Sequence, residues 1–149
     1  MAKARLEVTA PLAAGQALLL LDFTPQRDQR SPMATIRDLV SALRRRDGVD
    51  AAIVLGRDGL LIDGATEGAL DPEGLAAFVP PMVVSAVDMG LASGRGDFTL
   101  MVLEYGAGTA VVTSVSPDAL LLVLLRPTAN LASMLFDLRR HRAQIAALV

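Results

Sequence analysis

Three apolar runs near the C-terminal end, separated by short turn sequences, constrain the fold of this chain most. The runs span residues 98–105, 109–115 and 120–125, with Gly-Ala-Gly at 106–108 and Ser-Pro-Asp at 116–118 between them. Turns this short join antiparallel strands, whereas parallel strands need a crossover of roughly a dozen residues. The runs therefore predict an antiparallel meander. Its third run is apolar on both faces, which is typical of a central strand.

A second strand pair is predicted upstream. Residues 51–55 and 60–62 are apolar, and the sequence Gly56-Arg57-Asp58-Gly59 lies between them. Asp-Gly tolerates the positive φ angles that a tight hairpin turn requires. These residues are therefore expected to form a β-hairpin.

Cap residues predict three helices. Ser31 followed by Pro32 predicts the start of the first helix, which ends near Asp47-Gly48, because a hydroxyl cap and a proline at the first helical position favour initiation. Asp71-Pro72-Glu73 opens the second helix in the same way, and Asn130 caps the third. The predicted order is α-β-β-α-β-β-β-α, an α+β fold. One face of the third helix is apolar and consists of Leu131, Met134, Leu135, Leu138, Ile145 and Leu148.

The middle helix differs from the other two in its apolar character. Residues 74–87 contain no charge, and apolar side chains surround the helix instead of marking one stripe. A helix that is apolar all round has to be covered all round. Pro80-Pro81 is expected to break or kink it, since each proline lacks an amide donor and clashes with the preceding turn. The better-formed part is therefore expected to start at the prolines.

The length of 149 residues fits one domain with a well-buried core. Residues 1–30 are interpreted as an N-terminal extension and linker, and residues 31–149 as the domain. The extension holds two short apolar stretches, at 6–10 and 17–23, followed by a polar linker. Residues 16–23 have three open interpretations, which are an extra strand, an anchor to a partner and a partly disordered arm.

The composition excludes several kinds of site. The chain has no Cys, and His141 is its single histidine, so disulfides, thiolate zinc sites and motifs that need two imidazoles are excluded. A net charge of −2 and five aromatic residues do not provide the basic patch and stacking surface of a nucleic-acid-binding protein. We therefore expect no metal or other cofactor and no nucleic-acid partner.

The hydropathy pattern contains no predicted membrane span. The longest apolar run after the extension, at residues 119–125, is far below the roughly 20 residues that a bilayer requires. The run at 17–21 is too short for a secretory signal and ends at Asp22. A cytoplasmic location is therefore expected. The mean hydropathy of +0.46 is high for a soluble monomer, which indicates that some apolar surface meets a partner.

No catalytic constellation emerges from the motifs. The chain lacks a P-loop sequence, and Gly90, Gly94 and Gly96 fit a helix exit and turn better than a dinucleotide fingerprint. His141 is surrounded by arginines and is expected to face solvent rather than to serve as a base. We therefore predict that the chain is not an enzyme.

Two segments resemble a known family. Residues 48–62 (Gly-Val-Asp-Ala-Ala-Ile-Val-Leu-Gly-Arg-Asp-Gly-Leu-Leu-Ile) and 130–140 (Asn-Leu-Ala-Ser-Met-Leu-Phe-Asp-Leu-Arg-Arg) are similar to the roadblock/dynein light chain superfamily, in particular to its bacterial MglB-like regulators of small Ras-like GTPases. The resemblance covers about residues 36–148. The prolines at 80–81 and the long N-terminal segment depart from the family pattern.

The resemblance implies an α/β/α sandwich with a five-stranded antiparallel sheet. The middle helix would cover one face, and the first and last helices the other. It also implies a homodimer through the third strands and the middle helices. The expected dimer contacts are Phe98, Leu100, Met101, Val102 and Leu103 on the strand, and Val83 and Val87 on the helix.

Both faces of the third strand are apolar, so leaving it as an exposed edge would invite aggregation. Alternation predicts two apolar faces, with Phe98, Leu100 and Val102 on one and Met101, Leu103 and Tyr105 on the other. A partner is expected to bind the middle helix at positions i, i+3, i+4 and i+7, which are Met82, Ser85, Ala86 and Met89.

The leading hypothesis is a non-enzymatic homodimeric regulator or scaffold for a small Ras-like GTPase, with stimulation of GTP hydrolysis as one form of regulation. The alternative is a small-molecule sensor or profilin-like interaction module without a GTPase, which requires a pocket between sheet and helix. A hydrolytic enzyme has almost no residue support.

The arginines can be interpreted either as solvated surface residues or as residues that bind a partner. Residues 44–46 and the arginines at 139, 140 and 142 are most simply solvated helix ends, with an anionic partner surface as the alternative. Arg57 and Arg95 are each candidates for an arginine finger in a GTPase site. The family resemblance does not support a finger.

Overall fold

The structure is a computed structural model that describes residues 34–149. The cap predicted at residues 31–32 and the apolar stretches of the N-terminal extension lie outside the described residues. The elements are α2 (Ile36–Arg44), β1 (Val49–Gly56), β2 (Leu61–Thr66), α3 (Pro72–Ala92), β3 (Leu100–Tyr105), β4 (Gly108–Ser114), β5 (Ala119–Leu125), α4 (Leu131–Arg140) and α5 (Arg142–Ala146).

The five strands form one antiparallel sheet in the order β2-β1-β5-β4-β3. The meander is confirmed, because β3 pairs with β4 and β4 with β5. The hairpin of β1 and β2 is also confirmed, with Gly59 in the turn at φ +91°. The strand β5 lies at the centre of the sheet and is buried on both faces, as its apolar sequence predicts.

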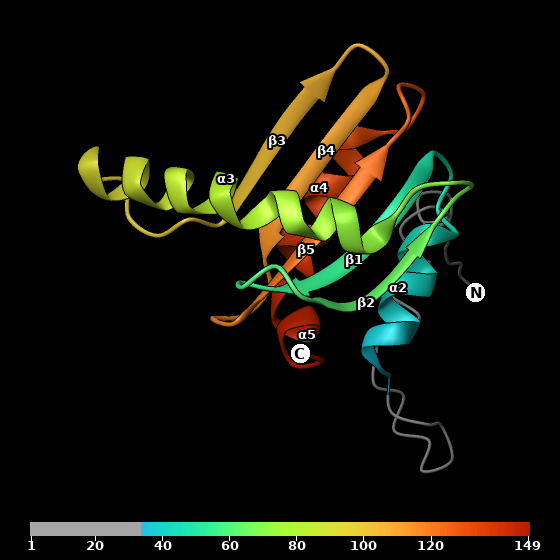
Figure 1. Ribbon diagram of the computed structural model, residues 1–149, viewed down its shortest axis with the longest axis horizontal. Helices are drawn as coiled ribbons and strands as arrows, with labels where there is room; N and C mark the ends of the chain where they lie inside the picture. Colours follow the sequence, from blue (N-terminus) through green and yellow to red (C-terminus); the bar gives the residue numbers. More distant parts are fainter. Residues whose placement is uncertain (1–33) are drawn as a thin grey trace, which may run out of the picture.

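Helices cover both faces of the sheet (Figure 1). The helix α3 packs on one face, where Ala76, Val79 and Val83 join a core cluster with residues of β1, β4 and β5. On the other face, α2, α4 and α5 pack over a second cluster, to which Leu39 and Met134 belong. The expected α/β/α sandwich is therefore the observed fold.

The first described helix begins later than its predicted cap. Thr35 is the N-cap of α2, and its Oγ1 accepts a hydrogen bond from the amide of Asp38 over 3.2 Å, while the Asp38 carboxylate accepts from the Thr35 amide over 2.8 Å. This capping box satisfies two amide donors, whereas the predicted Ser31-Pro32 start offers one hydroxyl. The predicted caps Asp71 and Asn130 are confirmed, since each accepts a hydrogen bond from its helix.

The predicted break in the middle helix is wrong. The helix α3 continues through Pro80 and Pro81. Val79 before the prolines and Val83 after them are both buried against the sheet, so packing holds the helix together on both sides of the prolines although two amide donors are missing.

The last predicted helix is divided in two at His141, and the expectation that His141 faces solvent is wrong. Its side chain is 2% exposed. Its backbone amide and its ring Nδ1 both lie 2.9 Å from the carbonyl oxygen of Asp137. Because a carbonyl can only accept, the ring donates from Nδ1. The inward turn of His141 ends α4 and starts α5.

Candidate protein interaction surface

The helix α3 leaves most of its apolar side chains at least partly exposed. Its three buried residues face the sheet, whereas Phe78 is 71% exposed, Met89 69% and Leu91 65%. Figure 1 shows the C-terminal half of α3 extending beyond the sheet. An apolar surface of this kind marks an interaction site in a soluble domain.

The four predicted partner contacts lie on one flank of this helix, which we call the α3 flank. Met82 and Ala86 are half-buried, and Ser85 and Met89 are exposed. The Ser85 hydroxyl donates to the carbonyl of Pro81 over 3.2 Å, so it is satisfied within the helix and leaves the flank apolar.

The predicted dimer contacts divide between an edge strand and the core. The strand β3 is at the end of the described sheet and pairs only with β4. Its four apolar residues, Leu100, Met101, Val102 and Leu103, are half-buried, as is Val87 of α3. Val83 is 3% exposed and belongs to the protomer's own core.

The predicted position of Phe98 is wrong. It packs with Met101 and Leu103 against the cluster under α3, not with Leu100 and Val102, which pack on the opposite cluster. The strand begins at Leu100, so strand alternation does not apply to Phe98.

Arg57 is held against the sheet. Its Nη2 donates to the Ser114 hydroxyl over 2.7 Å. It also borders a hollow of about 250 Å³ between α3 and β5, with Asp88 at the rim and Val83, Val87 and Leu120 among the lining residues. This is the pocket that a small-molecule sensor would need, but ligand pockets usually measure about 300–1,000 Å³. Because the hollow is smaller than a usual ligand pocket, it gives little support to the small-molecule sensor hypothesis.

The arginines after α2 are not simple solvated ends. Arg46 lies 2.9 Å from the Asp137 carboxylate, and the two side chains are 10% and 1% exposed. The contact is an ion pair without a well-directed hydrogen bond, because neither carboxylate oxygen of Asp137 has a hydrogen-bond partner. The Arg46 donors point instead to the Ser133 hydroxyl and the Met134 sulfur. Sequence reasoning missed this pair because Asp137 carries no motif.

A second ionic cluster joins the ends of four elements. Arg44 donates to the carbonyl of Val49 over 2.8 Å and pairs with Glu67 over 2.9 Å. Arg126 pairs with Asp50 over 2.7 Å and also with Glu67. The hydrogen bond from Arg126 to Asp50, with the charges of both carboxylates, raises the pKa of Arg126. These internal pairs argue against an anionic partner at Arg44.

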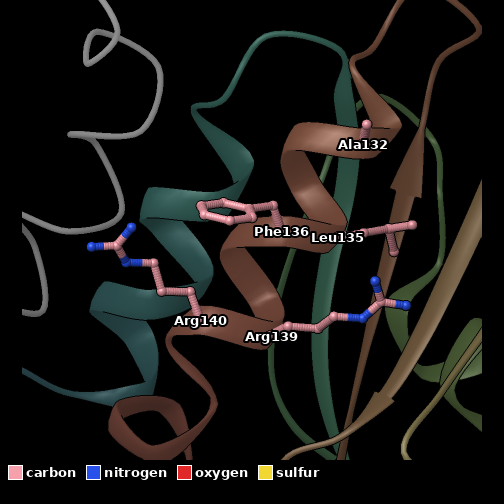
Figure 2. Close-up of a pocket in the computed structure, with 5 residues that line it drawn as sticks. All are labelled: Ala132, Leu135, Phe136, Arg139 and Arg140. Carbon is pink, nitrogen blue, oxygen red and sulfur yellow. The ribbon is translucent and has the colours of Figure 1, made fainter.

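The outer face of α4 carries a further hollow that the sequence analysis did not identify. It measures about 620 Å³ and is lined by Ala132, Leu135, Phe136, Arg139 and Arg140. Figure 2 shows these five side chains along the helix. We call this surface the α4 groove. Leu135 was assigned to the apolar face of the helix. The signal available in the sequence was Phe136, an aromatic residue outside that face and one helical turn before Arg139 and Arg140.

Among residues 34–149, no group of three or more His, Asp or Glu side chains is placed to hold a metal ion. Exposed apolar residues lie on α3, β3 and α4, which together make up the candidate interaction surface. A partner would bind this surface mainly by burying apolar side chains, with a few charged residues at its edges.

A family comparison matches the Roadblock/LC7 domain over residues 35–125. The chain belongs to the Roadblock/LC7 family. The match runs from the cap of α2 to the end of the central strand, so it covers the whole sheet and α3. A comparison with curated proteins gives no significant match.

Solved structures with this fold include MglB and roadblock proteins. The gliding protein MglB from Thermus thermophilus is 19% identical, with a TM-score of 0.65 over 73% of this chain and 84% of that one. An MglB with a tetrameric arrangement is 18% identical, with a TM-score of 0.66 over 73% and 83%. A Roadblock/LC7 domain from Streptomyces avermitilis is 22% identical, with a TM-score of 0.62 over 73% and 96%. At these identities the likeness shows a shared fold.

The fold also decides how the apolar α3 is interpreted. Among the described residues, α3 is long and apolar enough to cross a membrane. In this Roadblock/LC7 domain it is a helix of the sandwich, packed on the sheet through Ala76, Val79 and Val83. It is therefore a core helix with an uncovered outer surface and not a membrane span.

Proposed function

We propose that this Roadblock/LC7 domain is a non-enzymatic, homodimeric regulator or scaffold that binds a small Ras-like GTPase. The uncovered apolar surface of α3 carries the proposal. A helix with Phe78, Met89 and Leu91 each at least 65% exposed needs cover from outside its own domain. The similarity to MglB structures and the sequence resemblance to MglB-like regulators support a GTPase as the partner.

The proposed dimer joins β3 to β3 and brings two α3 helices side by side. Pairing would satisfy the free edge of β3 and bury part of the exposed end of α3. The two α3 flanks would then form one composite surface for the GTPase. Arg57 is engaged with Ser114, which favours regulation through the GTPase's own residues over an inserted arginine.

The test compares two charged substitutions on the same helix. Ala86→Arg places a cation on the α3 flank, whereas Ala77→Arg places it on an exposed position outside the flank. Pull-down is measured with the Ras-like GTPases of the same organism, loaded with GDP or a GTP analogue, and the dimer mass by light scattering. We expect at least tenfold weaker binding for Ala86→Arg, about 1.4 kcal/mol or more, with binding unchanged for Ala77→Arg.

Two outcomes would contradict the proposal. Unchanged binding by an intact Ala86→Arg dimer would exclude the α3 flank as the GTPase surface. Failure of the unsubstituted protein to bind any of these GTPases would exclude the GTPase itself. The rate of GTP hydrolysis in the same mixtures distinguishes a regulator from a scaffold.

A further inference from the structure

The α4 groove combines exposed apolar side chains with positive charge. Its five residues lie at i, i+3, i+4, i+7 and i+8, so they share one face of the helix. Phe136 is 52% exposed, and the two arginines are exposed at the C-terminal end of α4. Figure 2 shows Phe136 and Arg140 pointing to one side of the helix, and Leu135 and Arg139 to the other.

The arginines of the groove have no acidic partner among residues 34–149. The guanidinium carbon of Arg140 lies 5.8 Å from the centroid of the Phe136 ring, which is a cation–π contact. The ion pairs of the described residues involve Arg37, Arg44, Arg46 and Arg126 instead. An occupant of the groove would therefore bring apolar side chains together with a carboxylate.

The N-terminal extension has this composition. Residues 6–26 carry two charges, Glu7 and Asp22, and no cation. Within them, residues 17–23 (Ala-Leu-Leu-Leu-Leu-Asp-Phe) place Asp22 between a run of leucines and Phe23. The segment matches the groove in both apolar character and charge.

Charge also indicates which of two apolar surfaces, the α4 groove or the exposed side of α3, the segment would bind. The helix α3 contains Glu73 and Asp88 and no cation. An acidic apolar segment is repelled there and attracted to Arg139 and Arg140. The segment at residues 17–23 is therefore not expected to cover α3, whose surface stays available to a partner.

The connection between the segment and the domain is long enough. Phe23 and Ala34 are eleven residues apart, a reach of up to about 36–40 Å when extended, whereas the ten residues of α4 span about 15 Å. Ala34 packs on the same core cluster as Leu131, Met134 and Leu138 of α4, so the tether starts on the face of the sheet that carries the groove. A short tether also supplies an effective concentration of roughly millimolar.

We propose that residues 17–23 dock in the α4 groove of their own chain, with Asp22 facing Arg139. The groove is then covered from within the molecule, on the opposite face of the sheet from α3. This docking is separate from the proposed function, since its test involves no GTPase.

Cysteine cross-linking in the full-length chain tests the docking, because the protein has no native Cys. Ala17→Cys is combined with Ala132→Cys in the groove or, as a matched control, with Ala77→Cys on α3, since both alanines are exposed. After treatment with a short bismaleimide, denaturing gels separate links within one chain from links between chains. We expect at least fivefold more intrachain product with Ala132→Cys than with Ala77→Cys.

A charge exchange provides the second measurement. Asp22→Arg should lower the intrachain yield with Ala132→Cys several-fold, and Arg139→Glu added to Asp22→Arg should restore it in part. Equal yields at Ala132→Cys and Ala77→Cys, or no effect of the charge exchange, would overturn the proposal. A product mainly between two chains would overturn the intrachain assignment and give the groove to the segment of a second copy.

Discussion

The Arg46–Asp137 pair joins the end of α2 to α4 inside the protein, where water screens it little. We predict that Arg46→Met lowers the free energy of unfolding by about 3–5 kcal/mol, because it leaves the buried Asp137 carboxylate without its counter-charge. Urea unfolding at fixed protein concentration measures the effect. The double variant with Asp137→Leu should recover much of the loss, and Arg95→Ala, on an exposed position, should change stability by less than about 0.5 kcal/mol.

A loss below about 1 kcal/mol for Arg46→Met would mean that the Asp137 carboxylate is satisfied without Arg46. In that case the double variant would be no more stable than the single one. Comparing the single and the double variant therefore separates the effect of losing the Arg46 charge from the effect of losing its packing contacts.

Gly48 illustrates a backbone constraint at the turn between α2 and β1. Its φ is +83°, and a Cβ at this position would lie 2.6 Å from the Cβ of Ala129. Gly48→Ala should therefore destabilise the protein by about 2–4 kcal/mol, since strain in the left-handed region costs about 1–2 kcal/mol and the contact with Ala129 adds to it. Gly68→Ala is the matched control, with φ +65° and nothing within 4 Å of the added Cβ.

Unfolding curves of the two variants separate the clash from the strain. Gly68→Ala should cost only the strain, about 1–2 kcal/mol. Equal losses for both glycines would show that the loop around Ala129 shifts to accept the methyl group.

At the scale of elements, the sequence predicted what local chemistry decides. The Asp-Gly hairpin, the Asp71 and Asn130 caps and the meander are all present. These features depend on neighbours in sequence, so residue patterns suffice to find them.

The errors arose where distant contacts decide the outcome. The helix α3 passes through its prolines because residues on both sides of them pack on the sheet. The last helix breaks because His141 turns into the core. Neither contact can be inferred from helix propensity alone, which explains why both predictions failed.

The prolines of α3 give a prediction of their own. Pro81→Ala should raise the free energy of unfolding by about 2 kcal/mol, because the new amide can donate to the carbonyl of Ala77 and a proline in a helix interior costs about 3 kcal/mol relative to alanine. Part of that gain is lost through the freer unfolded chain. Thermal unfolding measures it.

Pro72→Ala serves as the control, since proline in the first turn of α3 removes no hydrogen bond. It should leave stability nearly unchanged. A Pro81→Ala protein that unfolds at the same temperature as the original would mean that the helix bends at residue 81 to regain the bond through water.

At the scale of the molecule, the candidate site was predicted in part. The spacing of Met82, Ser85, Ala86 and Met89 placed them on one flank, because helical periodicity survives in the fold. Val83 was expected at the dimer interface but also fills the protomer's own core. The alternation of apolar residues says which side chains share a face, not how deeply a neighbouring element covers them. The α4 groove was missed for the same reason.

The two edges of the sheet allow a direct test of the proposed dimer. The strand β3 forms one edge and β2 the other. The unsubstituted protein should scatter light at micromolar concentration as a particle of about twice 15.6 kDa. Met101→Arg places a charge on β3, on the face of the sheet that α3 covers, and should reduce the mass to that of one chain, since an unpaired cation buried in an interface costs several kcal/mol.

Ile62→Arg is the matched control on the opposite edge, where the native side chain is 48% exposed. It should leave the mass of the dimer unchanged, because β2 is not expected to meet a second copy. A stable interface of this kind buries about 800 Å² on each partner, more than one strand edge supplies, so α3 has to contribute to it. A clean monomer of the unsubstituted protein would therefore exclude the dimer and the composite α3 surface together, whereas loss of the dimer in Ile62→Arg would assign the contact to β2.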